Sequence, residues 1–221
     1  MRKFVIIVAG GKGLRMGGDI PKQFLPVENK PILMRTLDRF FEYDPQIQIV
    51  LVLPQGHFSY WNDLCKQYNY QTPHALVAGG ETRYHSVKNG LMSISCAPDD
   101  LVAVHDGVRP FVSVGTIAET FDKAAQLGAV IPVIDCIDSL REVVGDRSEA
   151  RNRSDFKLVQ TPQTFTYEVL KHAYLLNYRD SFTDDASVVE AAGHAVSMVQ
   201  GNRENIKITT TYDLKLATVL V

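Results

Sequence analysis

The stretch FVIIVAGGKGLRMGGDIPKQF, residues 4–24, combines a short apolar run with a glycine-rich, basic loop. The run at 4–9 has the Val- and Ile-rich composition of a strand buried on both faces. Backbone N–H groups without side chains around them form an anion-binding concavity, so the loop indicates a phosphate site. It is not a Walker A loop, because Asp19 stands where lysine is required. It is not a dinucleotide fingerprint either, because Met16 replaces the last glycine.

The same alternation of short apolar runs and longer amphipathic stretches continues along the chain. Strands are predicted at 47–53, 101–106 and 129–134, and helices at 31–43, 57–68, 82–94 and 113–128, the last ending on Gly128. This order predicts an α/β fold with a mostly parallel sheet and helices on both faces. Ligands of such sheets bind beyond the carboxyl ends of the strands. The loops at 9–22, 79–86 and 106–110 are therefore expected to meet at one site.

The pattern changes after Ile134, where residues 135–160 are rich in charge and contain the turn signal Gly145-Asp146. We expect a hairpin or arm here, packing through its apolar positions against a second subunit, with a simple surface hairpin as the alternative. Beyond it, helices are predicted at 166–178, 184–193 and 211–220, and strands at 194–201 and 205–209. Since no repeat or linker interrupts the sequence, residues 1–221 are expected to form a single domain with the arm at about 135–160.

Bulk composition limits the partners and the compartment. A formal net charge of −2 gives no basic field for nucleic acid. The three cysteines form no CxxC pair, which is typical of reduced thiols in a cytoplasmic protein. The first apolar run is shorter than the core of a signal peptide, and no stretch approaches a membrane span. A cytoplasmic location is expected.

Two further clusters contain residues suited to binding a nucleotide and a metal ion. In GGETRYHSVKNGL, residues 79–91, the two leading glycines allow the backbone to approach a flat base, and Ser86 adds a hydroxyl. In VHDGVRP, residues 104–110, Asp106 at a strand end suits Mg²⁺, which binds one or two carboxylates together with substrate phosphates. Arg83 and Arg109 either contact ligand or brace these loops.

The last cluster combines QTPQTF (160–165), FTDDAS (182–187) and NIKIT (205–209). Thr161 and Thr183 place hydroxyls beside turn residues, and Thr183 could equally cap a helix. Lys207, expected in a strand among apolar neighbours, needs an anionic partner or an open cleft.

Taken in order, these motifs resemble the 2-C-methyl-D-erythritol 4-phosphate cytidylyltransferases of the non-mevalonate isoprenoid route. The resemblance covers nearly the whole chain, and the spacing of RM and PKQ in the first motif is its most specific feature. It implies a Rossmann-like nucleotidyltransferase fold, a homodimer formed through an extended arm, and the use of CTP with Mg²⁺. The implied reaction transfers CMP to the polyol phosphate and gives 4-diphosphocytidyl-2-C-methyl-D-erythritol and pyrophosphate.

The resemblance also implies roles for individual residues. The catalytic cations are Arg15, Lys22 and Lys207. The nucleotide-binding residues are Ala9, Gly10, Gly11, Gly13, Gly80, Glu81, Ser86 and Asp106, and Asp106 also binds the metal. The phosphate of the sugar alcohol is held by Arg153 from the other subunit, Thr161 and Thr183.

The sequence departs from the family pattern in three places. Ala9-Gly10 stands for two alanines, and HDGVRP for HDAARP. In DCIDSLRE, residues 135–142, either Cys136 or Ser139 fills the position of a substrate-binding threonine. We favour Ser139, because it keeps the hydroxyl.

Three alternatives remain at this stage. One is the same chemistry on ribitol 5-phosphate or another polyol phosphate. Another is a non-catalytic nucleotide-binding protein of the same fold. The third is a sugar-phosphate nucleotidyltransferase that uses UTP or GTP.

Overall fold

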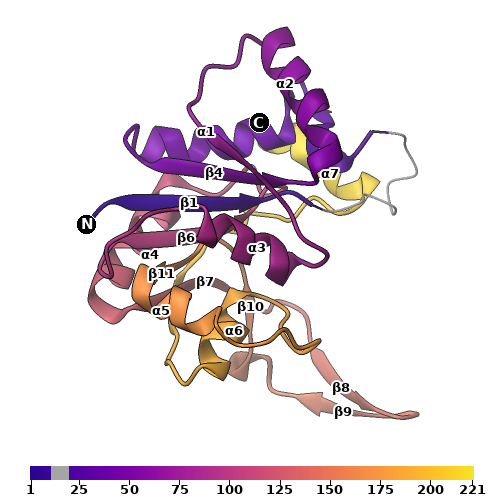
Figure 1. Ribbon diagram of the computed structural model, residues 1–221. Helices are drawn as coiled ribbons and strands as arrows, with labels where there is room; N and C mark the ends of the chain where they lie inside the picture. The colour runs from indigo at the N-terminus through magenta and orange to yellow at the C-terminus, as the bar shows by residue number, and fades with distance from the viewer. Residues whose placement is uncertain (11–19) are drawn as a thin grey trace.

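The computed structural model describes residues 1–10 and 20–221, and its centre is a mixed β-sheet (Figure 1). Strand β1 (Lys3–Val8) lies between β6 (Leu101–Asp106) and β4 (Gln48–Leu53) and is parallel to both. Strand β5 (Ala75–Ala78) extends this half, again in parallel. The parallel strands predicted from the apolar runs at 4–9, 47–53 and 101–106 are confirmed.

The other half of the sheet contains antiparallel pairs that the sequence did not predict. Strand β11 (Gln163–Thr166) lies antiparallel between β6 and β7 (Ala129–Asp135). Strand β10 (Lys157–Val159) pairs antiparallel with the end of β7, while β12 (Ser197–Gln200) pairs with β7 in parallel. The sheet therefore takes strands from both ends of the chain.

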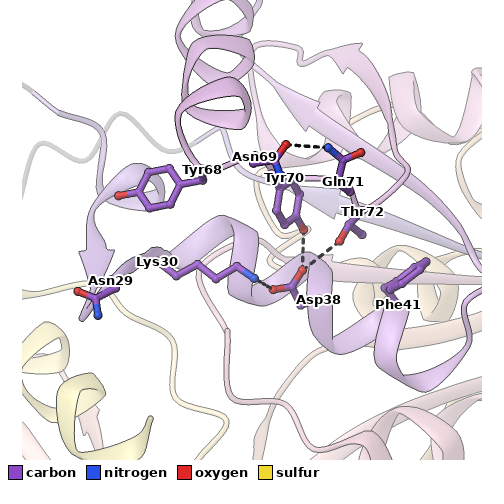
Figure 2. A pocket seen from close by; sticks show the side chains of 9 residues that line it. All are labelled: Asn29, Lys30, Asp38, Phe41, Tyr68, Asn69, Tyr70, Gln71 and Thr72. Carbon is purple, nitrogen blue, oxygen red and sulfur yellow. Dashed lines mark hydrogen bonds and ion pairs between the residues drawn. The ribbon is translucent and has the colours of Figure 1, made fainter.

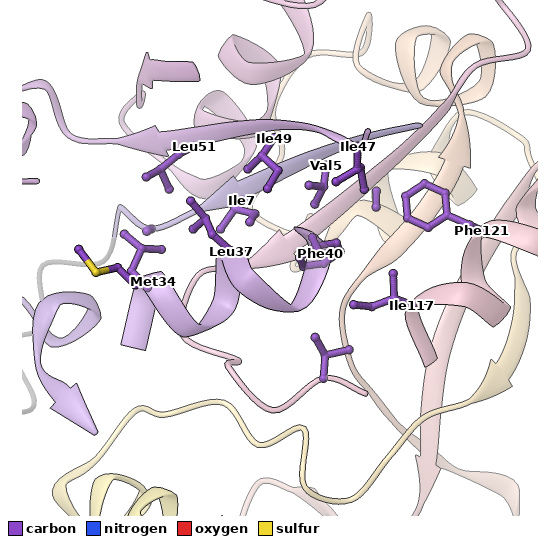
Figure 3. Packing of buried hydrophobic residues seen from close by; sticks show 14 of the residues in the cluster. Val5, Ile7, Met34, Leu37, Phe40, Ile47, Ile49, Leu51, Ile117 and Phe121 are labelled. Atoms are coloured by element: carbon purple, nitrogen blue, oxygen red, sulfur yellow. The ribbon is translucent and has the colours of Figure 1, made fainter. Parts of the chain in front are cut away.

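Helices cover both faces of the sheet, as expected. On one face, α1 (Ile32–Tyr43), α2 (Phe58–Gln67) and α4 (Val114–Leu127) pack on residues such as Val5 and Ile7. Figure 3 shows part of this core, with Leu37 and Phe40 of α1 against the strands. On the other face, α3 (Arg83–Met92), α5 (Tyr167–Ala173) and α6 (Asp185–Ala191) pack on residues such as Phe4 and Ile6. Alternate residues of β1 thus serve opposite faces.

Two expectations for the C-terminal part were wrong in detail. The helix predicted at 166–178 ends at Ala173. Residues 205–209 form no strand, although their apolar pattern predicted one. The physical reason is that Asn205 hydrogen-bonds Thr161 O at 2.8 Å through its side chain, and Ile208 N–H donates to Val108 O at 3.0 Å, outside the ladders of the sheet. Ile208 is fully buried with Val27 of β2 (Pro26–Val27), next to β3 (Lys30–Pro31) and α7 (Thr211–Leu220).

The hairpin expected near Gly145 is present. Strands β8 (Leu140–Val144) and β9 (Arg147–Arg151) pair antiparallel and extend away from the body of the molecule (Figure 1). Gly145 adopts φ 60°, which favours glycine in such a turn. The side chains of Val143 and Val144 are 72% and 69% exposed, so the hairpin presents apolar surface to its surroundings.

None of the helices described in residues 1–10 and 20–221 combines the length and apolarity needed to cross a bilayer.

Candidate active site

A cleft of about 310 Å³ opens where the chain leaves β1 and β6. All three loops that were expected to meet contribute to it, together with the segment at 207–209. Its lining comprises Val8, Ala9, Gly10, Lys22, Gln23, Gly80, Glu81, Thr82, Arg83, Ser86, Asp106, Val108, Lys207 and Thr209. Of the predicted residues, the structure thus brings together Ala9, Gly10, Lys22, Gly80, Glu81, Ser86, Asp106 and Lys207.

The carboxylate of Asp106 is surrounded by cations. Lys207 Nζ lies 2.9 Å from Oδ2, Arg109 Nε lies 3.4 Å from the same oxygen, and Arg83 Nε lies 3.5 Å from Oδ1. Burial alone would raise the pKa of Asp106, but the charges of Arg83, Lys207 and Arg109 outweigh it and hold the pKa well below its usual range. Asp106 is therefore ionised and gathers positive charge around itself.

A buried hydrogen-bond chain fixes Asp106 from behind. Its backbone N–H donates to Thr161 Oγ1 at 3.1 Å, and Thr161 Oγ1 lies 3.0 Å from His105 Nδ1. His105 Nε2 lies 3.1 Å from the carbonyl of Arg109, which can only accept, so Nε2 carries the ring proton. Burial lowers the pKa of His105 to about 4 and keeps the ring neutral, so Nδ1 accepts from Thr161. His105 is structural, and Thr161 lies beneath Asp106 rather than in the lining.

Ala9 joins the first loop both to the sheet and to the residues that follow the loop. Ala9 N–H donates to Val52 O at 3.0 Å, and its carbonyl accepts from Gln23 Nε2 at 2.9 Å. Gln23 belongs to a short 3₁₀ turn, Lys22–Phe24, which follows Pro21 and places Lys22 at the cleft. Arg15, Gly11 and Gly13 lie outside the described residues.

The loop before α3 is compact because two glycines allow it to be. Gly80 N–H donates to Ser86 Oγ at 3.1 Å, and the Ser86 hydroxyl donates to Thr82 O at 2.9 Å. A Cβ added at Gly80 would lie 2.4 Å from the Cβ of His85, closer than real atoms approach. Ser86 therefore shapes the loop while facing the cleft, and Glu81 is exposed at its rim.

The residues predicted for the second substrate lie apart from this lining. Thr183 is exposed just before α6, whose N-cap is Asp184, so the alternative role of Thr183 as the cap is wrong. Arg153 is exposed beyond β9 and donates to Ile137 O. With Cys136, Lys157 and Arg203 it lines a separate hollow of about 380 Å³, and Ser139 is not in that lining.

Two contributors to the site were predicted only in part or not at all: Arg83 was expected to contact ligand or brace the loops, but its partner was not predicted, and Gln23 was given no role. Arg83 donates to Asp185 Oδ2 at 2.6 Å, a contact between residues 102 positions apart that no spacing indicates. Gln23 holds the first loop, yet a glutamine in a PKQ turn carries no signal beyond the resemblance. Arg109 braces the loops, as one alternative proposed, because its Nη1 donates to Asn205 O at 2.7 Å.

A larger hollow of about 430 Å³ near α1 carries no comparable chemistry (Figure 2). Its carboxylate, Asp38, accepts hydrogen bonds from Tyr70 at 2.9 Å and Thr72 at 3.1 Å and pairs with Lys30. These contacts hold the segment after α2 onto α1, and they occupy the oxygens that a ligand would need.

Comparisons with known proteins agree with the geometry. A family model described as 2-C-methyl-D-erythritol 4-phosphate cytidylyltransferase (IspD) matches residues 3–221. Relatives of that name from Phocaeicola vulgatus and Bacteroides thetaiotaomicron are 57% and 54% identical over the whole of both chains. The crystal structure of the Francisella tularensis protein of that name is 32% identical, covers 100% of both chains and superposes with a TM-score of 0.83. That from Thermus thermophilus is 33% identical, with a TM-score of 0.78 and coverage of 100% and 98%.

Proposed function

The chain belongs to the 2-C-methyl-D-erythritol 4-phosphate cytidylyltransferase family, and on that premise we propose how its cleft works. It transfers CMP from CTP to 2-C-methyl-D-erythritol 4-phosphate and releases pyrophosphate. One observation supports this function above all others. Lys207, Arg83 and Arg109 cluster around Asp106, beside the backbone of Gly10 and Gly80. A cationic cleft bordered by glycine backbone suits a nucleoside triphosphate.

In the proposed reaction, a phosphate oxygen of the sugar alcohol attacks the α-phosphorus of CTP, and the bond from that phosphorus to the bridging oxygen of pyrophosphate breaks. The nucleophile is already an anion, so no general base is required. Positioning and stabilisation of charge must then supply the rate. We assign that stabilisation to Lys22, Lys207 and, on the resemblance alone, Arg15. Ala9 and Gly10, with Gly11 and Gly13 outside the described residues, would surround the base and phosphates. Gly80, Glu81 and Ser86 would surround cytosine and ribose.

We propose Mg²⁺ as the metal, with Asp106 as its protein ligand. The donor set fits, because Mg²⁺ uses one or two carboxylates and completes its shell with substrate phosphates and water. Within residues 1–10 and 20–221 no group of three or more His, Cys, Asp or Glu could hold a metal, so the phosphates would have to supply ligands. Among the residues that the structure describes, Oδ1 of Asp106 contacts Arg83 Nε at 3.5 Å, a long contact that a metal ion could share. When bound, the ion would neutralise charge on the triphosphate.

We further propose a homodimer in which the β8–β9 hairpin and the turn after it reach the partner's cleft. The exposed apolar side chains of Val143, Val144 and Phe156 support this arrangement. Arg153 would then hold the substrate phosphate of the neighbouring site, together with Thr183 and with Ser139 or Cys136. Thr161 would act through Asp106. A cytoplasmic location stays a prediction.

The test is a CTP assay with two acceptors, 2-C-methyl-D-erythritol 4-phosphate and ribitol 5-phosphate, read as pyrophosphate release. The relatives named above favour the first acceptor. Faster turnover of ribitol 5-phosphate would contradict the proposal, and no turnover of either would favour a nucleotide-binding protein without catalysis. In the active enzyme, replacing Lys22 with Ala should lower kcat by about 10²–10³, with a smaller effect on the KM for CTP.

A further inference from the structure

Arg83 has a position that the proposed reaction does not yet explain. It begins α3, lines the cleft, and contacts carboxylates from two distant parts of the chain. Its Nε lies 3.5 Å from Asp106 Oδ1 at the end of β6, and its Nη2 donates to Asp185 Oδ2 at 2.6 Å at the start of α6. Its side chain remains 28% exposed to the cleft.

Asp185 is completely buried, and both of its oxygens have partners. Oδ1 accepts from the Tyr174 hydroxyl at 2.7 Å, and Oδ2 accepts from Arg83. Burial raises the pKa of Tyr174 well above its usual value, and the negative charge of Asp185 adds to that effect, so the hydroxyl stays a donor. A buried carboxylate is tolerated only when it is paired and hydrogen-bonded. The start of α6 is thus fixed to Arg83.

The start of α6 is also where the second substrate is expected. Thr183 lies two residues before Asp185, and Asp184 between them caps the helix by accepting from Ser187 N–H at 2.9 Å. A shift of the segment Thr183–Asp185 would therefore break the contact between Asp185 and Arg83. The same guanidinium contacts Asp106, the carboxylate of the nucleotide side.

We propose that Arg83 is a positioning residue that sets the acceptor segment at Thr183–Asp185 relative to the nucleotide side at Asp106. This inference rests on the proposed function. In-line transfer between two bound substrates depends on their mutual placement, and an error of about 1 Å can cost on the order of 100-fold in rate. Arginine is needed, since its rigid fork of donors reaches two carboxylates at once, whereas lysine presents one point charge.

The experiment compares Arg83→Lys with Asp185→Asn, an isosteric change that removes the charge on the other side of the contact. CTP binding without acceptor, steady-state kinetics with both substrates, and thermal unfolding are measured for each. We expect kcat/KM for the polyol phosphate to fall by about 10- to 100-fold in either variant. CTP affinity should change by less than about threefold in Asp185→Asn, whose residue lies outside the lining of the cleft. The double variant should be no worse than the poorer single one, because both remove the same contact.

Arg2→Lys is the matched control, since Arg2 also pairs with a buried carboxylate, Asp100, but far from the cleft. It should lower thermal stability and leave both KM values unchanged. Losses confined to CTP binding, additive losses in the double variant, or lower stability with normal kinetics in both variants would overturn the inference. Failure of the proposed function is distinguishable, because wild-type enzyme would then turn over ribitol 5-phosphate faster or give no pyrophosphate with either acceptor.

Discussion

At the scale of single residues, the charge of Asp106 decides the character of the cleft. Its sequence position at the end of β6 predicted a metal ligand, and the structure adds that it holds Lys207, Arg83 and Arg109 in place. Lys207 is 43% exposed, so the ammonium group that pairs with Asp106 can also meet phosphate from the open side. One carboxylate can thus arrange the cations that a triphosphate requires.

A substitution at Thr161 tests whether the arrangement of cations around Asp106 depends on the hydrogen bond that Asp106 N–H donates to Thr161. Thr161→Val keeps the shape and removes the hydroxyl that accepts from Asp106 N–H. Leaving that buried N–H unpaired should cost about 1–3 kcal/mol in the free energy of unfolding, measured in urea. Thr161→Ser should recover most of the loss. A stable Thr161→Val variant with a raised KM for the polyol phosphate alone would instead assign Thr161 to direct substrate binding.

Asp100 gives a pH-dependent prediction far from the site. It accepts from Arg2 N–H at 2.7 Å and Ala97 N–H at 2.8 Å and pairs with the Arg2 side chain. Burial opposes ionisation, but these bonds to Arg2 and Ala97 outweigh it and lower the pKa of Asp100 from 3.8 to about 2. The folded state therefore binds protons less readily than the unfolded chain. The stability from Asp100 is present above the unfolded pKa and is lost as pH falls through the folded one.

Asp100→Asn should accordingly cost about 2 kcal/mol in the free energy of unfolding at pH 7. The difference from wild type should persist down to about pH 5 and shrink as the pH approaches about 2. Urea unfolding at several pH values measures it. A difference that stays constant over that range would show that the charge of Asp100 is not the source of this stability.

At the scale of elements, the sequence predicted the strands that are apolar throughout, and also β12, but missed β11. β1, β4 and β6 are almost wholly buried and were evident. β11 was not, because its buried Gln163 and Thr164 are polar and acceptable only through partners on other elements, Asp184 at 2.8 Å and Thr120 at 3.0 Å. The strand predicted at 205–209 is absent because Asn205 bonds through its side chain and Ile208 N–H donates to Val108 O, outside the ladders of the sheet.

The loop before α3 is the element whose geometry depends most on one residue. Gly80→Ala would bring two Cβ atoms to 2.4 Å, and His85 cannot yield because that atom is rooted in the helix backbone. We expect a loss of about 1–3 kcal/mol in stability and a rise of about tenfold in the KM for CTP. Gly56→Ala is the control, with nothing within 4 Å of the added Cβ, and should change neither quantity. Equal behaviour of the two variants in calorimetry and kinetics would contradict the prediction.

At the scale of the whole molecule, the sequence predicted two groups of site residues, one around the nucleotide and one around the second substrate. A single chain brings together only residues of the first group. Asp106, Lys22, Lys207 and Gly80 share a cleft, whereas Arg153 lines another hollow beside the hairpin. Motif order along the chain cannot say which residues meet within a subunit and which meet across subunits. A symmetric dimer with crossing arms would bring the cleft residues and Arg153 together, because each arm would then complete the cleft of the other subunit.

Complementation between two inactive variants tests that arrangement directly. Lys22→Ala has a defective cleft and an intact arm, and Arg153→Ala has an intact cleft and a defective arm. When the two are co-expressed with different tags, a mixed dimer joins one intact cleft to one intact arm. Its other site carries both defects, so purified mixed dimers should show about half of the wild-type kcat, although each parent dimer is nearly inactive. If instead each arm serves its own cleft, every site in the mixed dimer carries one defect and activity stays at the level of the parents. A monomer in sedimentation experiments would exclude the exchange altogether.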